Sequence, residues 1–196
     1  MKNKILFGLV LFIYLVLPII ILLMPSLFKY KFVILTIVGI IFYILFRILH
    51  IERKELGISK DNIISSIKRN LSLIIIGILI ILVIMGMGLN KFVPNEDIWF
   101  YPFYILISVP IQEFLYRGVF GYFDKYIIKN KIVAILLSSF CYSFVHIIYH
   151  DILTCILTFI IGIIWYIIYN KDKNLIGVIS SHIVLGILTI VLGIVD

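Results

Sequence analysis

The stretch VPIQEFLYRGVF, residues 109–120, places a carboxylate and a guanidinium inside an apolar run long enough to cross a membrane. Glu113 and Arg117 are four residues apart, so they are neighbours on one face of a helix. An ionisable group inside a bilayer costs about 2.5–3.5 kcal/mol on insertion scales, and an ion pair lowers that cost. Pro110 leaves the carbonyl of Leu106 without its helical donor, which gives water a reason to enter. The stretch indicates either a structural ion pair or a polar functional site.

The whole chain has the composition of a membrane protein. Of its 196 residues 63% are hydrophobic, and the mean hydropathy is +1.22, whereas soluble domains are roughly 45–50% apolar. About 20 apolar residues of helix cross the hydrocarbon core, and unpaired backbone groups exclude open strands there. We therefore predict an all-α, polytopic membrane helix bundle with about seven transmembrane helices. The segments are 5–28, 31–50, 71–92, 98–123, 131–149, 152–169 and 174–195.

Positive residues mark every second connection. The net charge of +7 gathers at the N-terminus and between the second and third, fourth and fifth, and sixth and seventh segments. By the positive-inside rule we expect a plasma-membrane protein with a cytoplasmic N-terminus and an outer C-terminus, and no nucleic-acid partner. The apolar run after MKNK exceeds a signal-peptide core and no A-x-A-like site follows it, so we expect a retained anchor helix.

The polar break around Pro94 divides the chain into two predicted parts. Residues 1–97 hold three membrane helices and an interfacial segment, and residues 98–196 hold the buried polarity. Within residues 51–70, Asp61 is expected to cap a short interfacial helix, with a plain solvated connector as the alternative.

Four ionisable residues lie well inside the predicted helices of the second part: Glu113, Arg117, His146 and His182. They come from three helices and, at 1.5 Å of rise per residue, from compatible depths. A carboxylate and two imidazoles are the groups needed to activate a water molecule and stabilise an oxyanion. They also resemble a His/His/Glu zinc set with an open position. Hydrogen-bonded core histidines and a structural ion pair remain the simpler alternative.

These residues resemble the motifs of the CPBP group, which contains the type II CAAX prenyl endopeptidases and the bacterial Abi or bacteriocin-immunity proteins. The family pattern is E-E-x-x-x-R, then F-x-x-x-H, then H-x-x-x-N, each within a membrane helix. This chain reads QEFLYR at 112–117, followed by Gly118, then YSFVH at 142–146 and HIVLG at 182–186. ELGI at 55–58 weakly resembles a leader sequence that is common in these proteins. The resemblance covers residues 98–196.

The resemblance implies an intramembrane endopeptidase that cleaves a membrane-associated substrate, either CAAX-type or bacteriocin-related. It implies that glutamate activates water with help from His146, that His182 and the residue four positions later bind the oxyanion, and that Arg117 orients a glutamate. Zinc held by Glu113, His146 and His182, or no cofactor at all, is compatible with these residues. The implied partners are a membrane-associated peptide or protein and the lipid bilayer.

Two departures from the family pattern matter, and Tyr142 in place of the phenylalanine is a milder one. Gln112 replaces the leading glutamate, and an amide cannot act as a base. Gly186 replaces the oxyanion asparagine, and loss of one such donor lowers a rate by about 10²–10³. Either Glu113 has taken over as base, or the protein is a catalytically inactive immunity or peptide-binding member, or the site persists only as packing. A transporter would show internal repeats or paired broken helices, and neither is visible. We favour the protease, with Glu113 and His146 acting on water and His182 supporting them.

Overall fold

The computed structural model describes residues 2–88 and 96–194, and these residues contain helices and connections but no strand. Five of the helices are long and apolar enough to cross a membrane, and a shorter apolar helix, Leu175–Val191, follows them. The remaining predicted segment runs from Phe100 to Ile128 as alternating α-helical and π-helical turns. The predicted all-α membrane helix bundle is confirmed.

The elements, in chain order, are α1 (Lys2–Leu23), η1 (Pro25–Tyr30), α2 (Lys31–Ile48), η2 (Arg53–Leu56), α3 (Ile63–Gly86), α4 (Phe100–Phe103), η3 (Tyr104–Ser108), α5 (Val109–Glu113), η4 (Phe114–Val119), α6 (Phe120–Phe123), η5 (Asp124–Ile128), α7 (Lys131–Phe144), η6 (Val145–Tyr149), α8 (Ile152–Asp172) and α9 (Leu175–Val191).

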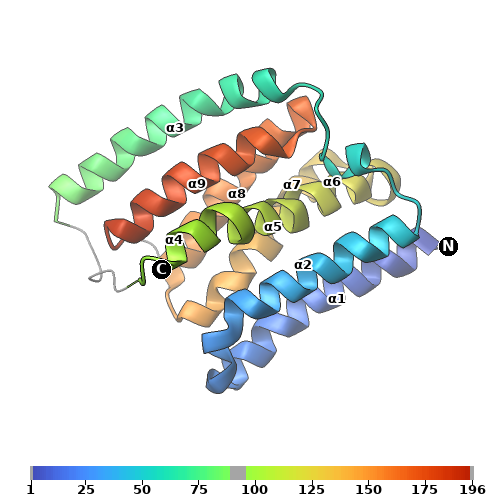
Figure 1. The fold of residues 1–196 in the computed structure, drawn as a ribbon, viewed down its shortest axis with the longest axis horizontal. Coiled ribbons are helices and arrows are strands. Elements are labelled where there is room, and N and C mark those ends of the chain that lie inside the picture. Colours follow the sequence, from blue (N-terminus) through green and yellow to red (C-terminus); the bar gives the residue numbers. More distant parts are fainter. Residues whose placement is uncertain (1, 89–95, 195–196) are drawn as a thin grey trace.

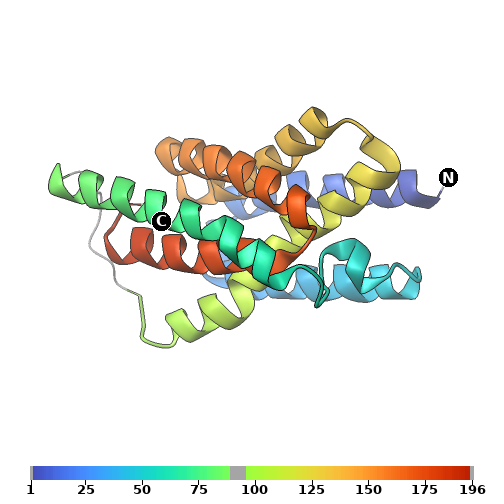
Figure 2. The same ribbon diagram turned by 90° about the horizontal axis from the view of Figure 1, so that it is seen from above.

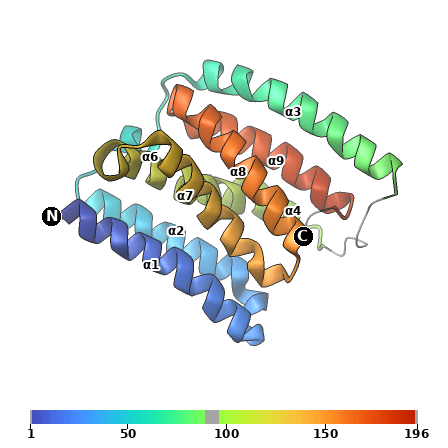
Figure 3. The ribbon, with the colours of Figure 1, turned by 180° about the vertical axis from the view of Figure 1, so that it is seen from behind.

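The central helix, α4 through η5, is buried from Glu113 to Phe123, whereas Leu106 near its start is 73% exposed. Figure 1 shows α1 and α2 as an antiparallel pair along one edge and α3 with α9 along the opposite edge. Seen from above, α8 and α4 lie on opposite sides of α9 (Figure 2). From behind, α7 and α8 cross the bundle between these two edges (Figure 3). The three N-terminal helices therefore flank the segment 98–196 on two sides.

Three chain segments that carry basic residues meet at the end of the bundle that carries the N-terminus (Figure 1). There residues within 50–62, 121–131 and 170–173 surround a polar hollow of about 1010 Å³. Its lining includes six lysines: Lys54, Lys125, Lys129, Lys131, Lys171 and Lys173. Five acidic residues, Glu52, Glu55, Asp61, Asp124 and Asp172, line the same hollow.

The connection between α2 and α3 differs from the expectation. No separate interfacial helix forms: α3 begins at Ile63 and continues to Gly86. Asp61 does not cap it, because Asn62 is the capping residue and makes no side-chain cap hydrogen bond. The Asp61 carboxylate instead lies 2.7 Å from Lys54 Nζ. The polar residues expected at the interface are therefore the first turns of a membrane helix, and its predicted end, residues 89–92, lies outside the described residues.

The ELGI stretch fixes this connection against the central helix. Leu56 is fully buried, and a Cβ atom on Gly118 would lie 2.5 Å from its carbonyl oxygen. Gly57 has a φ of +74°, which favours glycine, and its carbonyl accepts a hydrogen bond from the Leu175 amide at 3.0 Å. One short loop thus holds η4 and the start of α9 together.

The helix that carries Glu113 is wound loosely on both sides of this residue. A π-helical segment, Tyr104–Ser108, ends two residues before Pro110, and a second, Phe114–Val119, follows Glu113. Proline has no N–H, so the α-helical ladder is interrupted there, and π-helical turns are frequent at functional sites. The effect is to reorient the side chains between the two π segments relative to a regular α-helix.

Substituting Gly177 by alanine is expected to destabilise the contact between α9 and α3. A Cβ atom there would lie 2.3 Å from the Ser66 carbonyl oxygen, a backbone atom that cannot turn away. Overpacking of this kind costs typically about 1–3 kcal/mol. Thermal unfolding in detergent measures the loss, with Gly8→Ala as the matched control, because nothing lies within 4 Å of a Cβ at that helical glycine. Equal stability of the two variants would contradict the packing described here.

Candidate active site

Glu113, Arg117 and His182 meet in the interior of the bundle. Glu113 and Arg117 are fully buried, and His182 is 3% exposed. Glu113 Oε1 accepts a hydrogen bond from His182 Nδ1 at 2.6 Å. Its other oxygen, Oε2, lies 3.2 Å from Arg117 Nε. The i,i+4 neighbours predicted from sequence therefore form an ion pair, and a second helix, α9, adds the imidazole.

Aromatic rings surround the charged groups of this site. The contact between Arg117 and Glu113 is electrostatic, because none of the guanidinium nitrogens has a hydrogen-bond partner among the described residues. The guanidinium carbon instead lies 4.3 Å from the ring centre of Tyr142 and 5.1 Å from that of Trp165. Stacking of this kind stabilises a desolvated cation. Trp165 also stacks on His182, with 4.5 Å between ring centres.

The hydrogen bonds of the two histidines define which ring nitrogen carries the proton. His182 Nδ1–H donates to the Glu113 carboxylate, so its Nε2 is the acceptor facing the Tyr142 hydroxyl, 3.3 Å away. His146 Nδ1–H donates to the Tyr142 carbonyl at 2.8 Å. The Nε2 atom of His146 therefore carries a lone pair that is able to take a proton.

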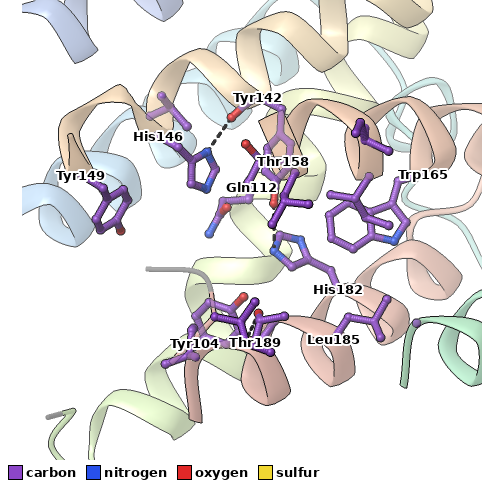
Figure 4. A pocket seen from close by; sticks show the side chains of 18 of the residues that line it. Tyr104, Gln112, Tyr142, His146, Tyr149, Thr158, Trp165, His182, Leu185 and Thr189 are labelled. Atoms are coloured by element: carbon purple, nitrogen blue, oxygen red, sulfur yellow. Dashed lines mark hydrogen bonds between the residues drawn. The ribbon is translucent and has the colours of Figure 1, made fainter. Parts of the chain in front are cut away.

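His146 and His182 line one cavity of about 370 Å³. Figure 4 shows their side chains and that of Gln112 around this space. Glu113 does not line it, because consecutive helical residues point in different directions and Glu113 faces Arg117. Gln112 Nε2 donates to Ser108 Oγ at 3.0 Å, so the amide oxygen is not used in that hydrogen bond. Most of the remaining wall is apolar and comes from α3, α8 and α9.

Of the residues predicted from sequence, three form one cluster and the fourth joins it indirectly. Glu113, Arg117 and His182 are in contact, whereas His146 is linked to them through Tyr142. Among the described residues no group of three or more His, Cys, Asp or Glu side chains is arranged to hold a metal ion. Both cysteines are free thiols. Glu113, His146 and His182, which the sequence left open as zinc ligands, therefore do not come together as a three-residue metal site.

Two aromatic residues of the site were not predicted. Trp165 lies inside an apolar helix, whereas tryptophan in membrane helices concentrates at the interfaces. Its unusual position in the sequence could have marked it as a candidate site residue. Tyr104 lines the cavity near the start of the central helix and was indistinguishable from an interfacial aromatic residue.

The fold and this site define a polytopic α-helical membrane protein with a largely apolar cavity into which two histidines and a glutamine project. Residues 94–188 match the family model described as type II CAAX prenyl endopeptidase Rce1-like. The match over this segment supports the resemblance to the CPBP family that the sequence motifs indicate. No curated protein and no solved structure matches the chain.

Proposed function

We propose that this protein is an intramembrane endopeptidase that hydrolyses a peptide bond in a membrane-associated substrate, CAAX-type or bacteriocin-related. The observation that supports this most is that two imidazoles, each with Nδ1 held by a fixed partner, face one cavity inside an apolar bundle. Ionisable side chains inside a membrane bundle are costly, and they are by default a functional-site hypothesis. The family match over residues 94–188 supports the same reaction class.

In this proposal the attacking water lies between His146 and Gln112. The Gln112 oxygen accepts one hydrogen bond from the water, and His146 Nε2 takes the other proton as the water oxygen bonds to the carbonyl carbon. The electron pair of the C=O double bond moves to the carbonyl oxygen, which becomes an oxyanion. When this intermediate collapses, the C–N bond breaks and His146 returns the proton to the leaving nitrogen. The sum is the addition of one water across one peptide bond.

Glu113 and Arg117 act in this proposal as positioning residues. The Glu113 carboxylate is fully buried and holds His182 by its Nδ1–H. Arg117 neutralises that carboxylate from the other side. Glu113 therefore supports the site through His182 and does not itself contact the water, which is a different role from the general base expected from sequence.

A second candidate is a catalytically inactive family member that binds a peptide, for example in bacteriocin immunity. Gln112 favours it, because an uncharged amide lines the cavity where the family pattern has a carboxylate. For either function we propose a plasma-membrane location with the lysine-rich end of the bundle in the cytoplasm. Labelling of Lys54→Cys by a membrane-impermeant thiol reagent in opened but not in intact cells tests this orientation.

The deciding experiment is peptide cleavage by the purified protein in nanodiscs, with membrane-proximal peptides as substrates, including prenylated C-terminal ones. Cleavage at a defined bond by the wild type, lost in His146→Ala, supports the endopeptidase. Peptide binding without cleavage supports the second candidate and excludes the first.

Replacing Gln112 by glutamate is expected to raise the cleavage rate by about tenfold or more, because it adds a second proton acceptor beside the water. The carboxylate keeps a partner, since the Ser108 hydroxyl is able to turn and donate to it. Gln112→Ala is the matched control and should lower the rate, since it removes the acceptor for the water. A glutamate variant no faster than the wild type would show that the cavity does not use a carboxylate at this position.

A further inference from the structure

The space left by the missing side chain of Gly186 is filled by the hydroxyl of Tyr104. A Cβ atom built on Gly186 would lie only 2.0 Å from Tyr104 Oη. The hydroxyl therefore stands where the first side-chain atom of any other residue would be. Gly186 is four residues after His182, so the two share one face of α9. The Tyr104 hydroxyl thus lies about one helical turn from the His182 ring along the wall of the cavity.

Tyr104 is held firmly in this position. Its side chain is 7% exposed and belongs to the π-helical segment before Pro110. Its ring meets the His182 ring edge-on, with 6.1 Å between centres, and packs against Phe100 at 5.5 Å. Figure 4 shows it with Thr189 beside α9 at the cavity wall. No hydrogen bond joins its hydroxyl to another residue in the part of the chain that the structure describes.

A tyrosine hydroxyl in this setting is a preorganised hydrogen-bond donor. Its O–H is able to rotate toward a ligand, and the low-dielectric surroundings strengthen any bond it donates to a negative oxygen. Donors fixed before the reaction stabilise charge that develops only in the transition state. Gly186 and Tyr104 also explain one another, since no larger residue fits at 186 while the tyrosine is present.

We propose that Tyr104 is a catalytic residue that donates its O–H to the oxyanion formed during peptide hydrolysis, and so supplies the donor that position 186 lacks. The inference rests on the proposed endopeptidase activity. The carbonyl oxygen accepts the hydrogen bond as the electron pair moves onto it, and the proton stays on the tyrosine. No further reactant is needed. The departure at Gly186 is then an exchange of one donor for another.

Kinetics of Tyr104 variants test this role. Tyr104→Phe should lower kcat by about 10²-fold with KM changed less than threefold, since it removes a single oxyanion donor. Tyr43→Phe is the matched control, because this α2 tyrosine does not line the cavity, and it should keep the wild-type rate. Tyr104→Ala combined with Gly186→Asn opens the space and adds an amide, and it should exceed Tyr104→Ala alone by about tenfold. A Tyr104→Phe enzyme within threefold of wild-type kcat, or no recovery in the double variant, would overturn the proposal.

Ligand binding separates this inference from the endopeptidase proposal. The probe is a phosphinic pseudopeptide, whose tetrahedral P–O⁻ oxygen mimics the oxyanion, compared with the amide peptide of the same sequence. The wild type should bind the phosphinic form at least tenfold more tightly than Tyr104→Phe does, and both should bind the amide equally. If this difference in binding is found but no peptide is cleaved, Tyr104 donates to the oxyanion mimic and the endopeptidase proposal is wrong. If both proteins bind the phosphinic form equally, or if the wild type does not bind it more tightly than the amide peptide, the proposed role of Tyr104 is wrong.

Discussion

Replacing His146 by alanine is expected to lower peptide cleavage by roughly 10²- to 10⁴-fold, the range for loss of a general acid–base group. The reason is its tautomer: Nδ1–H is committed to the Tyr142 carbonyl, so Nε2 is the lone pair available to an attacking water. Gln112 and Glu113 do not replace it, since one is an amide and the other does not line the cavity. Initial rates on one peptide in nanodiscs, with kcat and KM separated, measure the effect.

The control for this prediction is His150→Asn. His150 lies four residues further along the chain, ends η6 with a φ of +57° and does not line the cavity. Asparagine tolerates this left-handed conformation, so the variant should fold and cleave as the wild type does. If both variants cleaved at the wild-type rate, His146 would not be the base. If both lost activity, the effect would belong to the stability of η6 and not to proton transfer.

The class of the fold was predictable because the bilayer leaves few alternatives, but the start of α3 was not. Residues 63–70 contain serine, lysine, arginine and asparagine, a pattern typical of an interface. In the structure Ser66 and Asn70 are buried against α9, where Asn70 Oδ1 accepts a hydrogen bond from Ser181 Oγ at 2.8 Å. A partner distant in sequence supplies the hydrogen bonds that make these residues acceptable inside the bundle. A local pattern does not contain that information.

In the site, too, contacts within one helix were predictable from the sequence, and contacts between helices were not. The spacing of Glu113 and Arg117 predicts their ion pair, because it depends only on helical geometry. Two other features depend on how the helices pack and on the π-helical turns around Pro110. Glu113 also holds His182, and Gln112 lines the cavity whereas its neighbour Glu113 does not. The position of Tyr104 in the site could not be predicted from the sequence, because it depends on the space left by the missing side chain of Gly186.

Substituting Arg117 by methionine is expected to lower the free energy of unfolding by about 3–5 kcal/mol, the usual penalty for leaving one charge of a buried pair without its partner. Glu113 is fully buried, and only the His182 imidazole would remain beside it. Methionine keeps much of the volume and the contact with the rings of Tyr142 and Trp165, so the loss reports charge and not a cavity. Unfolding by denaturant in mixed micelles measures it.

The double variant Glu113→Gln with Arg117→Met separates charge from packing. Glutamine is still able to accept the hydrogen bond from His182 Nδ1–H, and no net charge is left unpaired. Replacing a complete buried pair by neutral groups is often neutral or stabilising, so the double variant should regain most of the stability lost by Arg117→Met. Lys54→Met, which breaks the exposed pair with Asp61, should leave the unfolding transition unchanged. If the double variant were as unstable as the single one, the guanidinium would matter through its packing on the aromatic rings. In that case Glu113 would not depend on Arg117 for its place in the membrane.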